Sequence, residues 1–212
     1  IYPMRVLRLT KSINVFFLIL FLSSCVTSQK PDRAEIPRPY ISLAEDGLIY
    51  DASITYKDFQ ASGLLVLKRI KAEDYHVVLL SKFGPAIMEF KMDGTDLTWI
   101  KTFDKLQNQV VQNFIERDFR MILLSTLENP RKINQLRNTS TYRKYKLNGE
   151  TKAHILIDPE TKHVVYAENR GFINFFKTKI EFDYNNKDVP EAISIRHNNL
   201  KLNIDLNLLK EI

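Results

Sequence analysis

The sequence contains few of the residues on which several protein classes depend. Its 212 residues include 1 Cys, 6 Gly, 4 His and 1 Trp. A single cysteine excludes an intramolecular disulfide framework and any cysteine-rich zinc or iron–sulfur site, because such sites need several thiolates. The chain also lacks the motifs GxxxxGK[ST], GxGxxG, GxSxG and HExxH. Nucleotide binding, serine hydrolysis and zinc-dependent proteolysis therefore have no support from motifs.

The remaining groups that carry chemistry in enzymes are scattered. Histidines occur at positions 76, 154, 163 and 197, each in or beside an expected strand and none three or four residues from another. The acidic pairs Glu45-Asp46 and Glu73-Asp74 fall in expected turns, where solvation explains them. We expect no catalytic residue, no metal site and no cofactor. An enzyme whose carboxylates or histidines meet only in the fold is the alternative.

The N-terminal segment has the three parts of a signal peptide. Arg5, Arg8 and Lys11 precede an apolar run from Val15 to Leu22, and two serines and Cys25 follow. The run is too short for a spanning helix, so residues 1–24 are predicted to be a signal peptide. Without this segment, 28 basic and 25 acidic residues leave a net charge of +3. Such a small excess gives no electrostatic reason to expect a nucleic-acid partner.

Leu22-Ser23-Ser24-Cys25 resembles the lipobox of bacterial lipoproteins, in which the cysteine is lipidated and becomes the new N-terminus. The alternative is an uncleaved anchor with a chance cysteine. Val26 and Thr27 follow in place of the Asp that marks inner-membrane retention, so the resemblance implies a lipid anchor in the outer membrane, facing the periplasm. Residues 25–40, rich in Ser, Thr, Gln and Pro, are predicted to be a flexible tether, and residues 41–212 a single domain.

Beyond the tether, apolar and polar residues alternate with the period of a β-strand. Leu200, Leu202, Ile204 and Leu206, for example, would share one face of a strand. We expect strands over 48–56, 59–70, 75–82, 86–92, 96–101, 141–147, 151–158, 163–169, 175–184, 192–197 and 200–208. Asp93-Gly94, Asn148-Gly149 and Asn198-Asn199 are typical of tight hairpin turns, so the strands are predicted to be antiparallel.

One helix is expected, over residues 104–124, because apolar residues recur there at helical spacing over a wide face. The polar segment 131–140 is predicted to be a loop. About eleven strands and one helix predict an α+β fold in which a strongly curved antiparallel sheet wraps a helical plug.

The segment Tyr75–Met92 predicts a hairpin with an unusual tip. Gly84 and Pro85 favour a tight turn that leaves Phe83 at or near the tip, with Lys82 beside it. An aromatic ring next to an ammonium group suits a lipid interface, where the ring enters the acyl boundary and the ammonium meets phosphate. The alternative is that Phe83 folds back to cover the core.

The order of these features resembles the LolA/LolB superfamily, in particular its outer-membrane receptor branch. The resemblance rests on the lipobox, the strand Ser62–Val66, the hairpin with an apolar residue before Gly84, the helix after the first strand set, and Val189–Ile193 before the final alternating strand. It implies an open β half-barrel with a helical lid, whose apolar cavity holds the acyl chains of a lipoprotein. Very sparse tryptophan and the long polar segment after the helix depart from the better-known receptors.

The resemblance implies a non-catalytic function: a monomeric receptor that accepts lipoproteins from a periplasmic LolA-like carrier and inserts them into membrane lipid. It places Phe83 at the membrane-contacting position of the hairpin formed by Lys82, Phe83, Gly84 and Pro85. Strand parity assigns to the cavity the residues Leu65, Leu67, Val78, Leu80, Ile87, Phe90, Phe114, Phe176, Ile180 and Phe182. The alternatives are a solid core, and an envelope lipoprotein that binds a hydrophobic ligand or partner without transfer.

Overall fold

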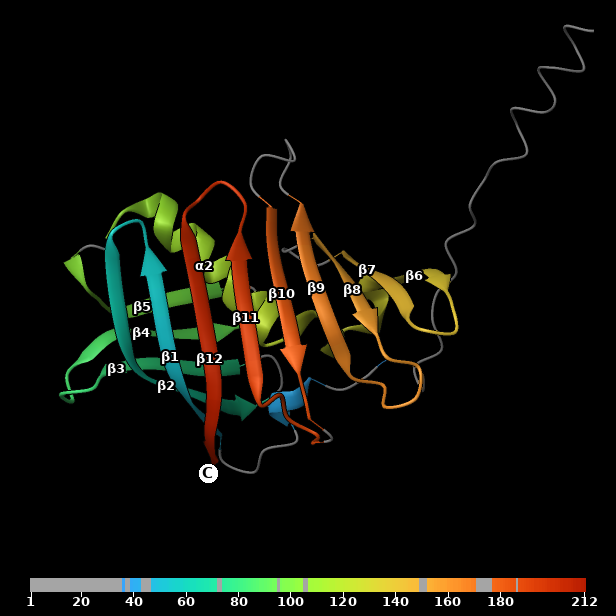
Figure 1. Ribbon diagram of the computed structural model, residues 1–212, viewed down its shortest axis with the longest axis horizontal. Helices are drawn as coiled ribbons and strands as arrows, with labels where there is room; N and C mark the ends of the chain where they lie inside the picture. The colour runs from blue at the N-terminus through green and yellow to red at the C-terminus, as the bar shows by residue number, and fades with distance from the viewer. Residues whose placement is uncertain are drawn as a thin grey trace, which may run out of the picture.

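The computed structural model describes residues 36, 39–42, 47–71, 74–94, 96–104, 107–148, 152–170, 177–185 and 187–212. The predicted signal peptide, Cys25 and most of the tether lie outside these residues. The strands are β1 (Leu48–Tyr56), β2 (Phe59–Lys71), β3 (Asp74–Ser81), β4 (Ala86–Asp93), β5 (Asp96–Thr102), β6 (Ile133–Asn138), β7 (Arg143–Asn148), β8 (Lys152–Ile157), β9 (Val164–Arg170), β10 (Lys177–Asp183), β11 (Ala192–His197) and β12 (Leu202–Glu211). The helices are α2 (Gln109–Ile122) and the short 3₁₀ helices η2 (Tyr40–Ser42), η4 (Ser125–Glu128) and η5 (Pro130–Lys132) (Figure 1).

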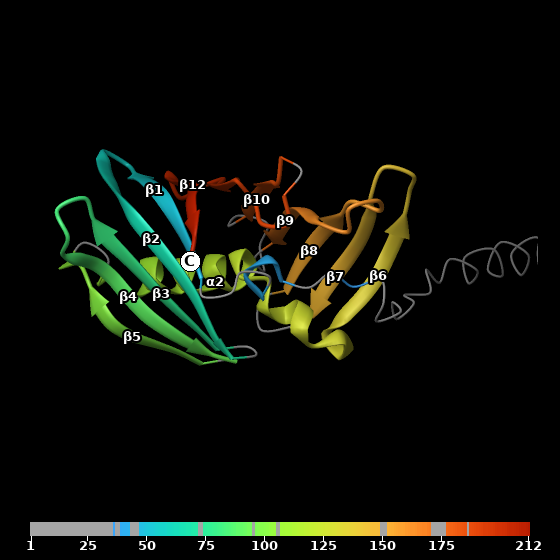
Figure 2. The ribbon, with the colours of Figure 1, turned by 90° about the horizontal axis from the view of Figure 1, so that it is seen from below.

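The strands form a single antiparallel sheet of 12 strands in the order β5-β4-β3-β2-β1-β12-β11-β10-β9-β8-β7-β6. The first and last strands pair in its middle, where Ala52 lies opposite Leu206. Strands β5 and β6 are the two edges, so the sheet is open and does not close into a barrel. The chain crosses from one edge to the other through α2, which lies within the curve of the sheet (Figure 2).

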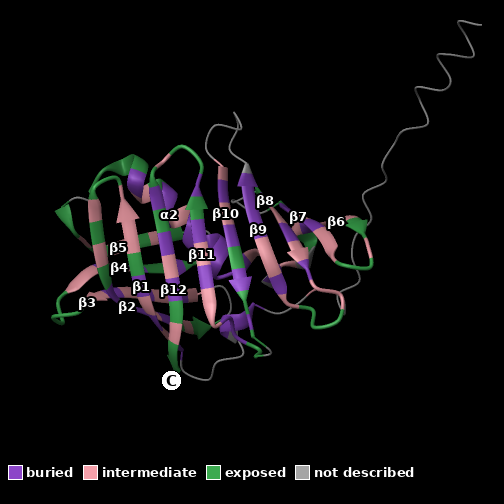
Figure 3. Ribbon diagram, in the orientation of Figure 1, coloured by how far each residue is buried: buried purple, intermediate pink, exposed green. Residues whose placement is uncertain are grey.

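The two faces of the sheet differ in burial, as period-two alternation predicts. In β12, for example, Leu202, Ile204 and Leu206 are buried on the concave face, whereas Asn203 and Asn207 are exposed. Figure 3 shows the same alternation along the neighbouring strands. The concave face of the sheet and the apolar face of α2 together form the hydrophobic core.

The segment 131–140, predicted to be a loop, instead contains the edge strand β6. Ile133 lies opposite Leu147 and Gln135 opposite Tyr145 on β7. Only Ile133 is buried in β6, and the strand ends in Arg137 and Asn138, both exposed. An edge strand needs one partner and tolerates polar and charged side chains, so it carries little alternating pattern. The prediction of a loop was wrong for this reason.

Helix α2 is shorter at its N-terminus than predicted. It begins at Gln109 because Asn108, in extended conformation, accepts a hydrogen bond from the backbone N–H of Val110 at 2.8 Å. Asparagine is among the best N-cap residues, since its side chain satisfies a backbone N–H that the helix leaves free. The helix ends at Ile122, and Leu124 has a left-handed backbone with φ of 53°.

A group of tyrosines is buried near the start of the domain. Tyr40 of η2, Tyr50 of β1 and Tyr184 after β10 are all buried, and the ring of Tyr40 lies 6.1 Å from that of Phe182. The hydroxyl of Tyr50 donates a hydrogen bond to the carbonyl oxygen of Pro190 at 3.0 Å. Burial raises the pKa of all three phenols above the ordinary tyrosine value, because it disfavours the charged form.

Candidate functional site

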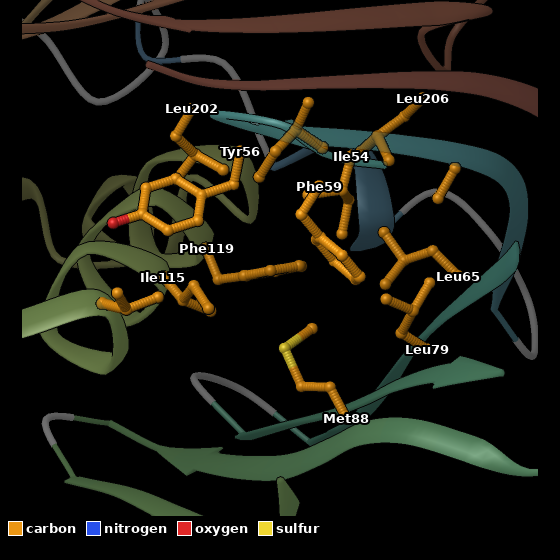
Figure 4. Close-up of a pocket in the computed structure, with 13 residues that line it drawn as sticks. Ile54, Tyr56, Phe59, Leu65, Leu79, Met88, Ile115, Phe119, Leu202 and Leu206 are labelled. Carbon is orange, nitrogen blue, oxygen red and sulfur yellow. The ribbon is translucent and has the colours of Figure 1, made fainter. Parts of the chain in front are cut away.

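An apolar pocket lies between α2 and the concave face of the sheet. Figure 4 shows side chains from the helix and from the strands pointing toward one another around it. Its lining residues come from β1 to β4, β12 and one face of α2: Ala52, Ile54, Tyr56, Phe59, Leu65, Leu79, Met88, Val111, Ile115, Phe119, Leu202, Ile204 and Leu206. The helix contributes Val111, Ile115 and Phe119 because residues four apart lie on one helical face.

The pocket is narrow in this conformation. Its free volume is about 30 Å³, room for one or two water molecules. Pockets that hold small-molecule ligands usually measure about 300–1,000 Å³. Most of its lining residues are buried, but Ile54, Tyr56 and Phe59 are partly exposed. These three flank the turn between β1 and β2, so the pocket reaches the surface at this end of the sheet.

The chemistry of the lining is almost wholly that of hydrocarbon. Among the side chains that line the pocket, only that of Tyr56 carries an oxygen or nitrogen atom, and Met88 contributes a thioether sulfur. The ammonium group of Lys57 lies 5.3 Å from the centre of the Tyr56 ring, at the edge of the pocket. A lining of this kind can shelter an apolar ligand.

The other flanks of α2 are held by polar contacts. Arg117 donates a hydrogen bond to Oγ1 of Thr178 on β10 at 2.8 Å, and its guanidinium lies 4.5 Å from the centre of the Phe114 ring. Burial lowers the pKa of Arg117, and the neighbouring carboxylate of Asp118 partly offsets this. Arg120 donates to the carbonyl oxygen of Gly94 at 3.1 Å. Polar side chains of α2 therefore make the hydrogen bonds that hold the helix in place, whereas the side chains that face the pocket are apolar.

The residues assigned to a cavity by strand parity are dispersed in the structure. Leu65 lines the pocket. Leu67, Phe90, Ile180 and Phe182 are buried on the concave face but lie elsewhere in the core, and Ile87 is partly buried against it. Phe114 is buried on another flank of α2, against the ring of His197. Phe176 lies outside the described residues.

Val78 and Leu80 lie on the opposite face of the sheet from the one assigned. In β3 the buried residues are Tyr75, Val77 and Leu79, whereas Val78 and Leu80 are only partly buried. The run Val77–Leu80 is apolar at every position, so parity could not be read from it, and a shift of one residue exchanges the two faces. The assignment of Val78 and Leu80 to the cavity is corrected accordingly.

Several lining residues were not singled out from the sequence. The alternation Ala52, Ile54, Tyr56 in β1 and the spacing Val111, Ile115, Phe119 in α2 were both available as signals. What they did not indicate is that β1, β12 and α2 meet at one place. That meeting results from the pairing of the first strand with the last.

The hairpin between β3 and β4 has an exposed apolar tip. Phe83 is 96% exposed, and Lys82, Gly84 and Pro85 are exposed around it (Figure 3). The turn is closed by the N–H of Ser81 donating to the carbonyl of Pro85 at 2.8 Å and that of Gly84 donating to Ser81 at 3.0 Å. Gly84 has φ of 102°, which favours glycine. Phe83 does not fold back onto the core.

A second hollow of about 500 Å³ lies over β9, β10 and β11. It is lined by Val165, Tyr166, Glu181, Phe182, Asp183, Ala192 and Ser194. Glu181 and Asp183 are exposed carboxylates, so this shallow surface does not suit an acyl chain. Within the described part of the chain, no three His, Cys, Asp or Glu residues are placed to hold a metal ion. None of the helices in that part has the length and apolar character needed to span a membrane.

Comparison with known structures identifies the fold. A LolA superfamily protein from Nitrosomonas europaea superposes with a TM-score of 0.52 over 84% of this chain and 89% of that chain, at 14% sequence identity. A DUF1329 family protein from Desulfovibrio piger matches 80% of this chain and 86% of its own length, with a TM-score of 0.48 and 9% identity. No protein-family model and no curated protein sequence matches the chain. The described part of the protein therefore has a LolA-like fold: a large, open antiparallel sheet with helix α2 against its concave face.

Proposed function

We propose that this protein is a lipid-anchored receptor of the outer membrane that accepts lipoproteins from a periplasmic carrier and releases them into the membrane, without catalysis. The observation that carries the proposal is the apolar pocket between α2 and the sheet, on a LolA-like fold. Each methylene group moved from water into such a pocket contributes about 0.8 kcal/mol, so acyl chains need no polar recognition to be held.

The pocket must widen before an acyl chain enters, because its free volume is about 30 Å³. Helix α2 is the wall that moves in this proposal and thus acts as the helical plug. Only apolar side chains join its pocket-facing side to β1–β4, whereas Arg117 and Arg120 fasten its other flanks. Apolar contacts have no directional bonds to break. In this proposal the packing of α2 against the strands along the pocket therefore separates more easily than the hydrogen bonds of Arg117 and Arg120.

The hairpin tip is the proposed membrane contact. Phe83 is almost wholly exposed, and no apolar neighbour covers it in this conformation. The adjacent Lys82 supplies a cation for lipid phosphate. Lipidation of Cys25 would hold the domain at the same membrane, in keeping with the lipobox sequence.

A binding or assembly module without transfer is the second candidate. The small free volume of the pocket favours it, because a pocket that stays this narrow cannot take up an acyl chain and release it again. In this case the protein would hold a hydrophobic ligand or a partner and deliver nothing to lipid.

The test uses a fluorescent diacylated lipopeptide as the probe. Binding is measured by fluorescence anisotropy, and delivery by the rate at which the bound probe enters liposomes of phosphatidylethanolamine and phosphatidylglycerol. Ile54→Glu places a charge on the pocket lining, and Thr55→Glu, its neighbour on the opposite face of β1, is the matched control. We expect Ile54→Glu to abolish binding, Thr55→Glu to preserve it, and Phe83→Glu to preserve binding but slow delivery. Binding without delivery by the unsubstituted protein would favour the second candidate. If the protein does not bind the lipopeptide at all, neither candidate holds as a protein that binds acyl chains.

A further inference from the structure

The pocket opens at one end of the sheet, where several connections of the chain meet. Lys57 in the β1–β2 turn donates its backbone N–H to the carbonyl of Lys201 before β12 at 2.9 Å. The β3–β4 hairpin belongs to the same end, since Ser81 pairs with Gly63 near the start of β2. Phe103, after β5, donates its N–H to the carbonyl of Ile87 at 2.9 Å. We call this end of the molecule the pocket rim: residues 56–59, 82–85, 103–104, 107–111 and 198–202.

Exposed apolar side chains gather on the rim. Phe83 is 96% exposed at the hairpin tip, Phe103 is 42% exposed after β5, and Val110 is 56% exposed in the first turn of α2. The ring of Phe103 stacks on that of Phe59, with centres 6.4 Å apart and planes at 18°. Because Phe59 also lines the pocket, apolar surface runs without interruption from the pocket lining to the outside.

The polar groups of the rim match a bilayer surface. Lys57, Lys82 and Lys201 are exposed there, together with Asp58 and Asp104. Apolar residues interleaved with lysines are typical of surfaces that lie at the boundary between headgroups and acyl chains, because the rings bury while the ammonium groups reach phosphate. Continuity with a hydrocarbon-lined pocket points to lipid in preference to a protein partner.

We propose that the whole pocket rim docks on the phospholipid bilayer, with Phe103 and Val110 forming a second contact in addition to Phe83. This deepens the proposed function and rests on it. With both contacts at the interface, an acyl chain leaves the pocket directly into the acyl region and does not cross water.

The position of the predicted lipid anchor is compatible with this orientation. Strand β1 begins at Leu48, at the far end of the sheet, and spans about 30 Å to Tyr56 on the rim. The segment from Cys25 to Ile36 reaches at most ~40 Å when extended. A protein anchored at Cys25 therefore has enough chain to turn its rim toward the same membrane.

The first test compares apolar residues of similar exposure at the two ends of the sheet. Phe103→Ser combined with Val110→Ser removes the second contact, while Ile70→Ser and Leu209→Ser, at residues 56% and 59% exposed near the far ends of β2 and β12, are the controls. In the lipopeptide assay we expect the rim variant to bind the probe normally and deliver it roughly threefold or more slowly, as partial loss of buried apolar area requires. The controls should deliver it normally.

The second test locates the rim in the bilayer directly. In a Trp99→Phe background, which removes the native indole, tryptophan is placed at Phe83, Phe103 or Ile70, and its quenching by brominated phospholipid is measured on liposomes. Quenching at 83 and 103 but not at 70 is the expected result. Quenching at 83 alone would overturn the second contact and leave the proposed receptor function intact. If the probe is never bound, the proposed function itself fails.

Discussion

The imidazole of His197 on β11 and the carboxylate of Asp118 on α2 form a buried contact, with Nε2 and Oδ2 2.7 Å apart. On the other side of the ring, Nδ1 lies 2.8 Å from the carbonyl oxygen of Leu202, which can only accept. The imidazole of His197 therefore bridges α2 and the first residue of β12 through its two ring nitrogens. This pair joins the helix to the β11–β12 turn beside the pocket, since Leu202 is also a lining residue.

Breaking this pair should destabilise the fold strongly. His197→Leu leaves the Asp118 carboxylate buried without its partner, and we expect a loss of about 3–5 kcal/mol in the free energy of unfolding, measured by urea denaturation. Asp118→Leu with His197→Leu should recover part of that loss, because both members of the pair are then removed, although Arg117 loses the carboxylate beside it. The matched control is His76→Leu, which breaks the part-exposed contact of His76 with Glu89 at 2.9 Å and should cost below about 1 kcal/mol. Equal losses in the two single variants would contradict the role given to Asp118.

Two neighbouring leucines in β3 test which face of the strand is buried. Leu79 is 2% exposed and lines the pocket, whereas Leu80 is partly exposed on the other face. Leu79→Ala should lower the free energy of unfolding by about 2–5 kcal/mol, as large-to-small changes in a core do. Leu80→Ala should cost less than about 1.5 kcal/mol. The reverse order, in thermal or chemical denaturation, would mean that the register of β3 is shifted by one residue.

Gly63 should tolerate no side chain. A Cβ there would lie 2.0 Å from the carbonyl oxygen of Leu80 and 3.0 Å from its carbon, and both atoms belong to the backbone of the paired strand. Gly63→Ala must push β2 and β3 apart, and we expect a loss of about 3 kcal/mol or more. Faster hydrogen exchange in β3 would report the same separation. Ser62→Ala, at the exposed neighbouring position, is the control and should change stability by less than about 0.5 kcal/mol.

Alkaline pH should unfold the protein through its buried tyrosines. The pKa values of Tyr40, Tyr50 and Tyr184 are raised by burial, so the folded state keeps protons that the unfolded state releases near pH 10. The stability present at neutral pH is therefore lost as the pH rises above about 10. Tyrosinate absorbance should increase in two phases, first from exposed tyrosines and then together with loss of the β-sheet circular dichroism. A single phase that precedes unfolding would show that these phenols are accessible.

Expectations that depended on neighbouring residues along the chain were close to the structure. Alternation located the strands on either side of the helix, and Gly84-Pro85 indicated a tight turn with Phe83 at its tip. Strand β6 was missed because an edge strand pairs on one side only and its residues need not alternate. Val78 and Leu80 were assigned to the wrong face of β3, since parity within an apolar run such as Val77–Leu80 is ambiguous until a partner strand sets the register.

The sequence by itself determined the antiparallel strands, the position of the helix between the two sets of strands and the exposed aromatic turn, because each follows from interactions among residues close in the chain. Only the tertiary structure decided which residues form the pocket. That choice depends on β1 pairing with β12 and on α2 crossing from one sheet edge to the other, which bring together Ile54, Ile115 and Ile204. Contacts between residues so far apart in the sequence are set by the packing of whole elements against one another, and a local sequence pattern does not predict them.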